Sequence, residues 1–342
     1  MDQVQWQEFL TARGAVWEGN EAHFPDTSAD TYLVDLSPLG SVSVTGPDSQ
    51  KFLQGQLTCD LLNLPDWHSS LGAHCNPKGR MISAFRVVKH SQEHFTLLLP
   101  RDLAGIAREA LAKYAVFFKT ELSECGDDQR WLGLQGKGVL ERASGLLGIG
   151  RLAPGAAHSF GFDGTEVVAC ALAEDQLALG VPAKAAPALW EKLAGQAEVA
   201  GYCHWTARQI QAGVPQLHAA TSEMFIPQML NLHLLGGVSF KKGCYTGQEV
   251  VARMQYLGAA KRRMYRARCE SGGLPEPGAP VSTEDGKSIG NLVQACRSDE
   301  GIELLAVLTI GKVAEGAPLF LADGRELKLQ ELPYDADADP LA

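Results

Sequence analysis

A cysteine beside two lysines, just before the expected start of a helix, is the arrangement in this sequence that most clearly suggests chemistry. Residues 236–249 hold four glycines and include Lys242 and Cys244. Thr246 and Glu249 have the spacing of a capping box, which predicts that a helix begins there. The positive end of that helix and a nearby ammonium group would both favour the thiolate form of Cys244. The pattern therefore predicts a reactive thiol, and the alternative is a buried, inert cysteine in a tight turn.

The same helix start would also suit a ligand carboxylate or phosphate, because its backbone N–H groups point outward. Its apolar face is expected to come from Val250, Val251, Met254 and Leu257. Basic residues crowd this part of the chain, namely Lys241, Lys242, Arg253, Lys261, Arg262, Arg263, Arg266 and Arg268. Two interpretations stay open for this basic stretch: a solvated face or a local anion site.

Strands and helices alternate irregularly in the part of the chain that precedes this segment. Apolar runs predict strands at residues 32–36, 41–44, 81–88, 95–99, 131–134 and 166–169. Helices are expected to begin near Pro47, Asp102 and Pro187. For the helix after Asp102, the spacing predicts a buried face of Leu103, Ile106, Ala110, Leu111 and Tyr114. This order is typical of an α+β fold rather than of regular βαβ winding.

The last part of the chain differs from the rest in its pattern of predicted strands and turns. Short β-like runs at residues 264–269 and 304–308 alternate with the hairpin dipeptides Asp285-Gly286 and Asp323-Gly324. We therefore expect two regions: an α+β region over residues 1–258, itself of two interleaved units, and a small all-β barrel over residues 259–342.

Composition and charge limit the possible functions. The chain has 342 residues, 45% hydrophobic and 20% charged, and its net charge of −10 disfavours tight binding to nucleic acid by the surface as a whole. None of the eight cysteines forms a CxxC pair, so no zinc or linear iron–sulfur motif and no metal site is expected. No GxGxxG or P-loop follows a strand. No targeting or membrane-spanning segment is evident, which predicts a cytoplasmic protein with free thiols.

Several motifs resemble those of the YgfZ family of folate-binding proteins. The most specific is residues 242–249, KGCYTGQE, which is flanked by similar segments at residues 225–228 and 236–240. Further similarity lies at residues 52–58, FLQGQLT, at residues 73–80, AHCNPKGR, and at Trp205 with residues 212–215, AGVP. The resemblance runs from about residue 30 to residue 263.

The resemblance implies the three-part fold of the glycine-cleavage T-protein and a central cavity for tetrahydrofolate or a derivative. It implies that Trp205 and Tyr245 contact the folate, and that Lys242 and Cys244 are the functional pair. Arg80 and Arg253 are candidates for the carboxylates of the folate tail. Core packing is the alternative for Trp205, and a surface turn is the alternative for the segment around Arg80.

The family resemblance also implies a role. Its members support iron–sulfur cluster assembly or repair and tRNA modification, so the expected partners are folate and the enzymes of those processes, with a monomer as the expected state. T-proteins that transfer aminomethyl groups use an aspartate shortly after the turn that matches Gly79, and residues 80–85 contain none. The matching place for a second folate-site tryptophan is Leu39. The alternatives are a one-carbon transferase and a module that docks tRNA or a partner through residues 261–263.

Overall fold

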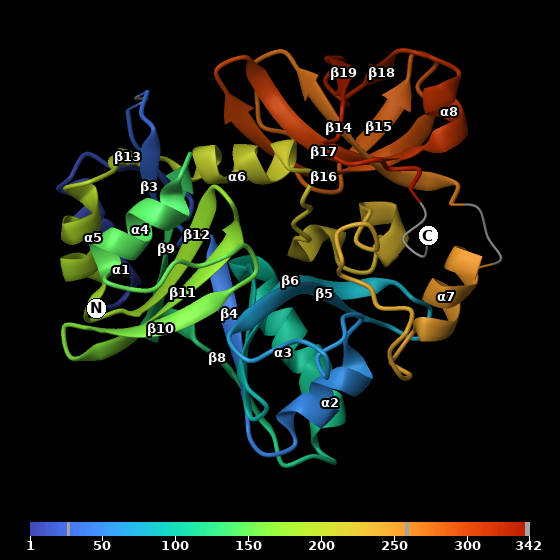
Figure 1. Ribbon diagram of the computed structural model, residues 1–342. Coiled ribbons are helices and arrows are strands. Elements are labelled where there is room, and N and C mark those ends of the chain that lie inside the picture. Colours follow the sequence, from blue (N-terminus) through green and yellow to red (C-terminus); the bar gives the residue numbers. More distant parts are fainter. Residues whose placement is uncertain (26–27, 257–259, 339–342) are drawn as a thin grey trace.

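Two β-sheets with helices packed against them form the first two thirds of the chain, and a separate β-barrel follows (Figure 1). The computed structural model describes residues 1–25, 28–256 and 260–338. In that part of the chain every strand pair is antiparallel except β3 with β13. The predicted α+β architecture with a C-terminal all-β barrel is confirmed.

The first sheet has five strands in the order β5-β6-β7-β4-β8. Its strands are β4 (Leu39–Thr45), β5 (His68–Cys75), β6 (Met81–Ser91), β7 (His94–Pro100) and β8 (Glu121–Glu124). Helices α2 (Ser49–Gln56) and α3 (Arg101–Ala115) pack against it. β7 is buried from Phe95 to Pro100, so its apolar residues run continuously instead of alternating.

The second sheet has six strands in the order β10-β11-β12-β9-β3-β13. Its strands are β3 (Thr31–Asp35), β9 (Gln129–Gly136), β10 (Ala157–Phe162), β11 (Thr165–Ala173), β12 (Gln176–Pro182) and β13 (Glu198–Ala200). The helices of this unit are α1 (Gln3–Thr11), α4 (Val139–Leu147), α5 (Ala186–Ala194) and α6 (Tyr202–Gln211). A two-stranded hairpin precedes the sheet and consists of β1 (Val16–Glu18) and β2 (Glu21–His23).

The segment after α6 has little regular structure before the barrel begins. It contains the short 3₁₀ turns η2 (Ala219–Thr221) and η3 (Pro227–Leu230), and the helix α7 (Gln248–Tyr256). One more 3₁₀ turn, η1 (Gly126–Asp128), lies earlier in the chain, just before β9. The closed barrel has the order β14-β17-β16-β15-β18-β19. Its strands are β14 (Arg262–Cys269), β15 (Pro280–Thr283), β16 (Ser288–Ser298), β17 (Gly301–Thr309), β18 (Leu319–Phe320) and β19 (Glu326–Gln330), with the short helix α8 (Ile310–Ala314) after β17.

Both predicted hairpin dipeptides lie in turns of the barrel. Gly286 has a φ of 77° between β15 and β16, and Gly324 has a φ of 87° between β18 and β19. Such left-handed conformations favour glycine, which explains the dipeptides. The predicted division between residues 258 and 259 lies outside the described residues, and β14 begins at Arg262.

The predicted buried face of α3 is partly wrong. Leu103, Ala110 and Leu111 are buried, but Ile106 is 40% exposed and Tyr114 is 37% exposed. Smaller residues, Ala104 and Ala107, are buried instead. The cause is the close approach of α3 to β4, where a Cβ placed on Gly40 would lie 3.3 Å from the Ala104 Cβ.

Candidate functional site

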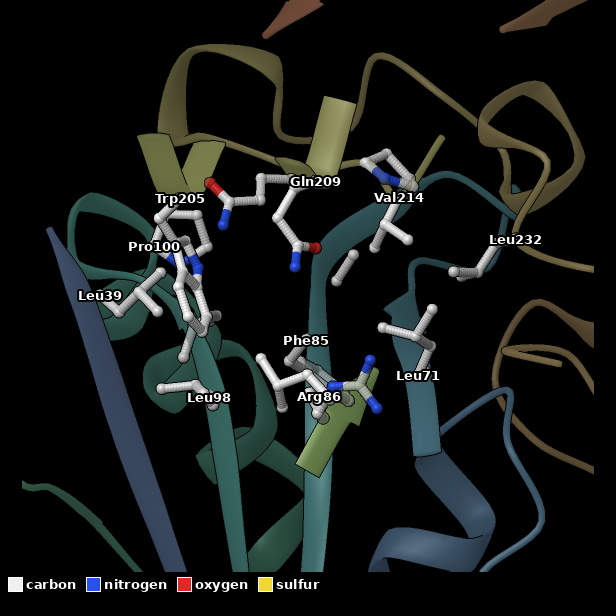
Figure 2. A pocket seen from close by; sticks show the side chains of 16 residues that line it. Leu39, Leu71, Phe85, Arg86, Leu98, Pro100, Trp205, Gln209, Val214 and Leu232 are labelled. Atoms are coloured by element: carbon white, nitrogen blue, oxygen red, sulfur yellow. The ribbon is translucent and has the colours of Figure 1, made fainter. Parts of the chain in front are cut away.

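A cavity lies where the first sheet, the helix α6 and the segment after α6 meet (Figure 2). Its cavity volume is about 60 Å³, and the space between its walls, open solvent included, is about 560 Å³. The lining residues come from both sheets and from segments far apart in the chain. They are Leu39, Leu71, Gly72, Ala84, Phe85, Arg86, Leu98, Leu99, Pro100, Leu172, Trp205, Gln209, Val214, Pro215, Gln216 and Leu232. We call this space the central cavity.

Trp205 forms one wall of the central cavity from helix α6. Its side chain is 1% exposed, and its ring packs directly on strand β9. A Cβ on Gly133 would lie 2.8 Å from the Trp205 ring, so the missing side chain of Gly133 makes room for the indole. Leu39 lies near Trp205 (Figure 2). Leu39 therefore lines the same cavity, and that wall is less aromatic than it would be with a second tryptophan at this position.

Gln209 supplies an amide to the central cavity, one helical turn after Trp205. Its Nε2 donates a hydrogen bond to Gln176 Oε1, and Gln176 Nε2 donates to Gln135 Oε1 at 2.8 Å. Gln135 Nε2 in turn donates to His204 O at 3.1 Å. This chain of amides fixes the orientation of Gln209, and no described residue donates a hydrogen bond to its Oε1. That oxygen remains available as an acceptor for a ligand N–H group.

Arg86 is the cation of the central cavity, and sequence reasoning missed it. It lies on β6 and is half-buried, with Nη1 donating to Ser69 Oγ at 3.2 Å. Burial lowers the pKa of its guanidinium. No aspartate or glutamate of the described chain lines the cavity. A charged residue inside the apolar run of residues 81–88 was the signal that could have identified Arg86.

The two predicted folate-tail cations lie elsewhere. Neither Arg80 nor Arg253 is among the residues that line the central cavity. Arg80 donates from Nη1 to the backbone oxygens of Met224 at 2.6 Å and Glu223 at 3.2 Å. Arg253 is exposed on α7. Arg80 therefore holds a turn in place, and Arg253 lies on a surface helix.

The signature loop, residues 242–249, forms a second region of interest around a buried lysine. Lys242 is 8% exposed, and its Nζ donates to the carbonyl oxygens of Gln54 at 2.7 Å, Leu57 at 2.6 Å and Cys59 at 2.8 Å. Burial lowers the pKa of Lys242 to about 8. None of the Nζ hydrogen bonds in the described chain goes to Cys244. Lys242 thus fixes the chain after α2 to the signature loop.

Tyr245 and Cys244 of the signature loop face different surroundings. Tyr245 is buried, with Lys242 Nζ 5.2 Å from its ring centre, and its hydroxyl has no hydrogen-bond partner among the described residues. Burial raises the pKa of that hydroxyl. Cys244 is exposed, whereas Cys59, Cys75, Cys170, Cys269 and Cys296 are buried. Neither Tyr245 nor Cys244 lines the central cavity.

The predicted capping box at the start of α7 is wrong. The helix begins at Gln248, and Gln248 Oε1 accepts a hydrogen bond from the backbone N–H of Tyr245 at 3.3 Å. Thr246 Oγ1 instead donates to Gln56 Oε1 at 3.2 Å. Of the predicted apolar face, Val251 is buried, Val250 and Met254 are half-buried, and Leu257 lies outside the described residues.

Two glycines lock the signature loop against the turn that follows β5. Gly247 has a φ of 83°, and a Cβ there would lie 2.5 Å from Asn76 O. Gly79 has a φ of 71°, and a Cβ there would lie 2.9 Å from the Val250 Cβ. The two most specific sequence motifs therefore pack directly on each other through positions that only glycine fits.

The cations of the basic stretch that lie on β14 are paired with carboxylates, apart from Arg262. Arg266 and Arg268 both bind Glu303, which is 1% exposed, with Arg268 Nη2 at 2.7 Å from Glu303 Oε1. Arg263 forms an ion pair with Asp337. Three of the eight cations thus pair with carboxylates, and Lys242 binds carbonyl oxygens, while Lys241, Arg253, Lys261 and Arg262 are exposed.

Comparisons with known proteins agree with this architecture. Residues 4–235 match the model of the GCVT N-terminal domain. The chain is 33% identical over 313 residues to the tRNA-modifying protein YgfZ of Cronobacter sakazakii, covering 89% of this chain and 93% of that protein. It is also 33% identical over 311 residues to the protein of that name from Klebsiella pneumoniae, with the same coverage.

A solved structure shows the same fold. The glycine cleavage system aminomethyltransferase T from Bartonella henselae superposes with a TM-score of 0.77 at 19% identity, covering 98% of each chain. No described helix is long and apolar enough to cross a membrane, and the described residues contain no group of three or more metal-ligating side chains. With this identity and coverage, the chain belongs to the YgfZ family and has the fold of the glycine-cleavage T-protein.

Proposed function

We propose that the chain binds tetrahydrofolate, or a derivative of it, in the central cavity. The observation that carries this proposal is the composition of the cavity wall: a tryptophan, aliphatic side chains, one oriented amide and one guanidinium. A flat, polar-edged ring such as a pterin requires an apolar or aromatic slot with few hydrogen-bonding partners. Trp205 supplies the aromatic surface, and Gln209 and Arg86 supply the polar contacts.

We propose that folate binding serves an accessory role in tRNA modification and in the assembly or repair of iron–sulfur clusters. The printed name of the curated relatives, tRNA-modifying protein, supports the first half of this role. Cys244 is our candidate for the functional thiol, since it is exposed while five of the other cysteines are buried. We place the protein in the cytoplasm as a monomer, in contact with the enzymes of these processes.

Two other functions are less well supported. Aminomethyl transfer would use a carboxylate near the folate nitrogen, and no Asp or Glu of the described chain lines the cavity. Docking of tRNA through residues 261–263 would need free cations, but Arg263 is engaged by Asp337. An enzyme that transfers one-carbon groups and a pure tRNA-binding module are therefore the secondary candidates.

Calorimetric titration of the reduced protein with tetrahydrofolate tests the folate site. We expect Trp205→Phe to weaken binding about tenfold, because the smaller ring leaves part of the wall empty. Trp190→Phe is the matched control: Trp190 is also 1% exposed but lies in the other core, beside Trp6. No binding by the wild type, or equal weakening in both variants, would contradict the proposal.

A cellular test addresses the role of Cys244. Cys244→Ser should remove the support of tRNA modification and iron–sulfur enzymes, because the thiol is lost while the surface changes little. Cys125→Ser, at a half-buried cysteine outside the signature loop, should leave that support intact. Normal support by Cys244→Ser would exclude this thiol from the function.

A further inference from the structure

The guanidinium of Arg86 has no carboxylate partner in the described chain. Its cross-strand neighbours are aliphatic, Leu71 on β5 and Leu98 on β7, and both also line the central cavity. Among the described residues, the guanidinium forms one hydrogen bond, to Ser69 Oγ. The nearby Cys170 thiol is buried, and burial raises its pKa, so it supplies no negative charge at neutral pH.

Lys89, a buried cation on the same strand, has the carboxylate partner that Arg86 lacks. Lys89 is 4% exposed and lies 3.3 Å from Asp66 Oδ1, and its Nζ also donates to Leu64 O at 2.8 Å. Withdrawing a cation from water is unfavourable unless a partner offsets the loss of hydration. Lys89 has a carboxylate partner, whereas Arg86 has only the Ser69 hydroxyl, so no described residue offsets the charge of Arg86.

Carboxylates do occur close by, in an adjoining cavity that shares Gln216 with the central cavity. Glu21 and Asp102 line that second space. Asp102 is engaged there, because its Oδ2 accepts a hydrogen bond from the backbone N–H of Ala219 at 3.0 Å and lies 3.5 Å from His218. The central cavity itself therefore carries a net positive charge.

We propose that Arg86 makes the central cavity selective by charge, so that it accepts folates with a neutral or electron-rich ring and rejects cationic one-carbon forms. This inference rests on the proposed folate site. Tetrahydrofolate and its 5-formyl form have no charge on the ring, whereas a methenyl bridge between N5 and N10 places a positive charge there. In a cavity of low dielectric, a guanidinium repels such a charge over several ångströms.

The selectivity would also disfavour one-carbon transfer through a cationic folate in this cavity. The segment after Gly79 has no carboxylate to balance a cationic folate, and Arg86 further along the same strand adds repulsion. A protein with such a cavity would bind neutral reduced folate in order to carry it or to respond to its concentration.

The test is calorimetric titration of the full-length reduced protein with 5-formyltetrahydrofolate and with 5,10-methenyltetrahydrofolate, in mildly acidic buffer where the methenyl form persists. We expect the wild type to bind the neutral ligand about tenfold or more tightly than the cationic one. Arg86→Met should bring the two affinities within about threefold, and Arg86→Lys should preserve the difference, because it retains the charge.

Arg80→Met is the matched control, since it removes a cation that lies outside the cavity, and it should leave the ratio of the two affinities unchanged. Should Arg86→Met fold poorly, Arg86→Gln tests the same loss of charge with a polar side chain. Equal affinities in the wild type, or an unchanged ratio in the uncharged variants, would overturn the charge selectivity alone. Binding of neither ligand would overturn the folate site and this inference with it.

Discussion

The signature loop and the central cavity are built in opposite ways. The signature loop is continuous in sequence, and it holds its position through polar contacts such as those of Lys242 with three carbonyl oxygens. The central cavity gathers residues from Leu39 to Leu232 and is mainly apolar, with Arg86 as its cation. Cys244 is exposed, while Trp205 is enclosed. The thiol that we propose as functional and the cavity that we propose for folate therefore lie in separate regions.

The largest expected effect comes from removing the lysine at the centre of the signature loop. Lys242→Met would leave the carbonyl oxygens of Gln54, Leu57 and Cys59 without their donor, and should lower the free energy of unfolding by about 3–5 kcal/mol. Urea unfolding measures this. Lys241→Met, at an exposed neighbour, should stay within about 0.5 kcal/mol. A loss below about 1 kcal/mol in Lys242→Met would mean that water replaces the ammonium group.

The next largest effect on stability is expected in β5, at His74. This strand joins the two regions, because Leu71 lines the central cavity and Cys75 lies against Gly247 of the signature loop. His74 is fully buried, neither ring nitrogen has a partner among the described residues, and burial lowers its pKa to about 4 from 6.5. The stability due to neutral His74 is present above pH 6.5 and is lost as the pH falls toward 4. At the acid end the loss is on the order of 3 kcal/mol.

His74→Phe should reduce the acid sensitivity while leaving stability at pH 7 within about 1 kcal/mol, because no hydrogen bond is lost. Burial lowers the pKa of His90 and His233 to about 4 as well, so part of the acid loss should remain. Urea unfolding at several pH values between 4 and 7 compares the variant with wild type. His158→Gln, at an exposed histidine, should follow the wild-type curve. Parallel curves for wild type and His74→Phe would show that another group causes the acid loss.

A smaller effect is expected where the two sequence motifs pack together. Gly247→Ala should lower the free energy of unfolding by about 2 kcal/mol, because the left-handed backbone and the contact with Asn76 O both oppose a Cβ. Gly243→Ala is the control within the same loop, since a Cβ there meets no heavy atom within 4 Å and the change should be below about 1 kcal/mol. Similar losses at both positions would indicate that general loop flexibility decides the outcome.

The smallest effect on stability should come from the residue that we expect to matter most for function. Cys244→Ser changes an exposed side chain and should alter the free energy of unfolding by less than about 0.5 kcal/mol. Folate affinity should also stay unchanged, because Cys244 does not line the central cavity. Weaker folate binding in this variant would show that the two regions are coupled after all.

Local structure was predictable from the sequence wherever a short pattern decides it. The strand pair at residues 81–88 and 95–99, the helix at Pro187 and both barrel hairpins are present. The capping box at the start of α7 was predicted incorrectly, because the Thr246 hydroxyl donates its hydrogen bond to Gln56 Oε1 and does not cap the helix. That partner is distant in sequence, so no local rule could identify it.

The lining of the central cavity was predictable only where a family motif marks it. Trp205 and Leu39 lie in the central cavity, but Arg86 and Gln209 escaped notice, and Arg80 and Arg253 lie elsewhere. The wall depends on the pairing of β5, β6 and β7 and on the placement of α6, which joins residues over a hundred positions apart. The two cations that the sequence suggested for the folate tail, Arg80 and Arg253, lie instead in a turn and on a surface helix.

The buried amide of Gln294, on barrel strand β16, binds the segment that lines the central cavity. Its Oε1 accepts a hydrogen bond from the backbone N–H of Gln216, and its Nε2 donates to Val214 O at 3.5 Å. Val214 and Gln216 form part of the cavity wall, so these hydrogen bonds join that wall to the barrel. If a ligand leaves through this wall, Gln294→Ala should speed its release more than it weakens equilibrium affinity.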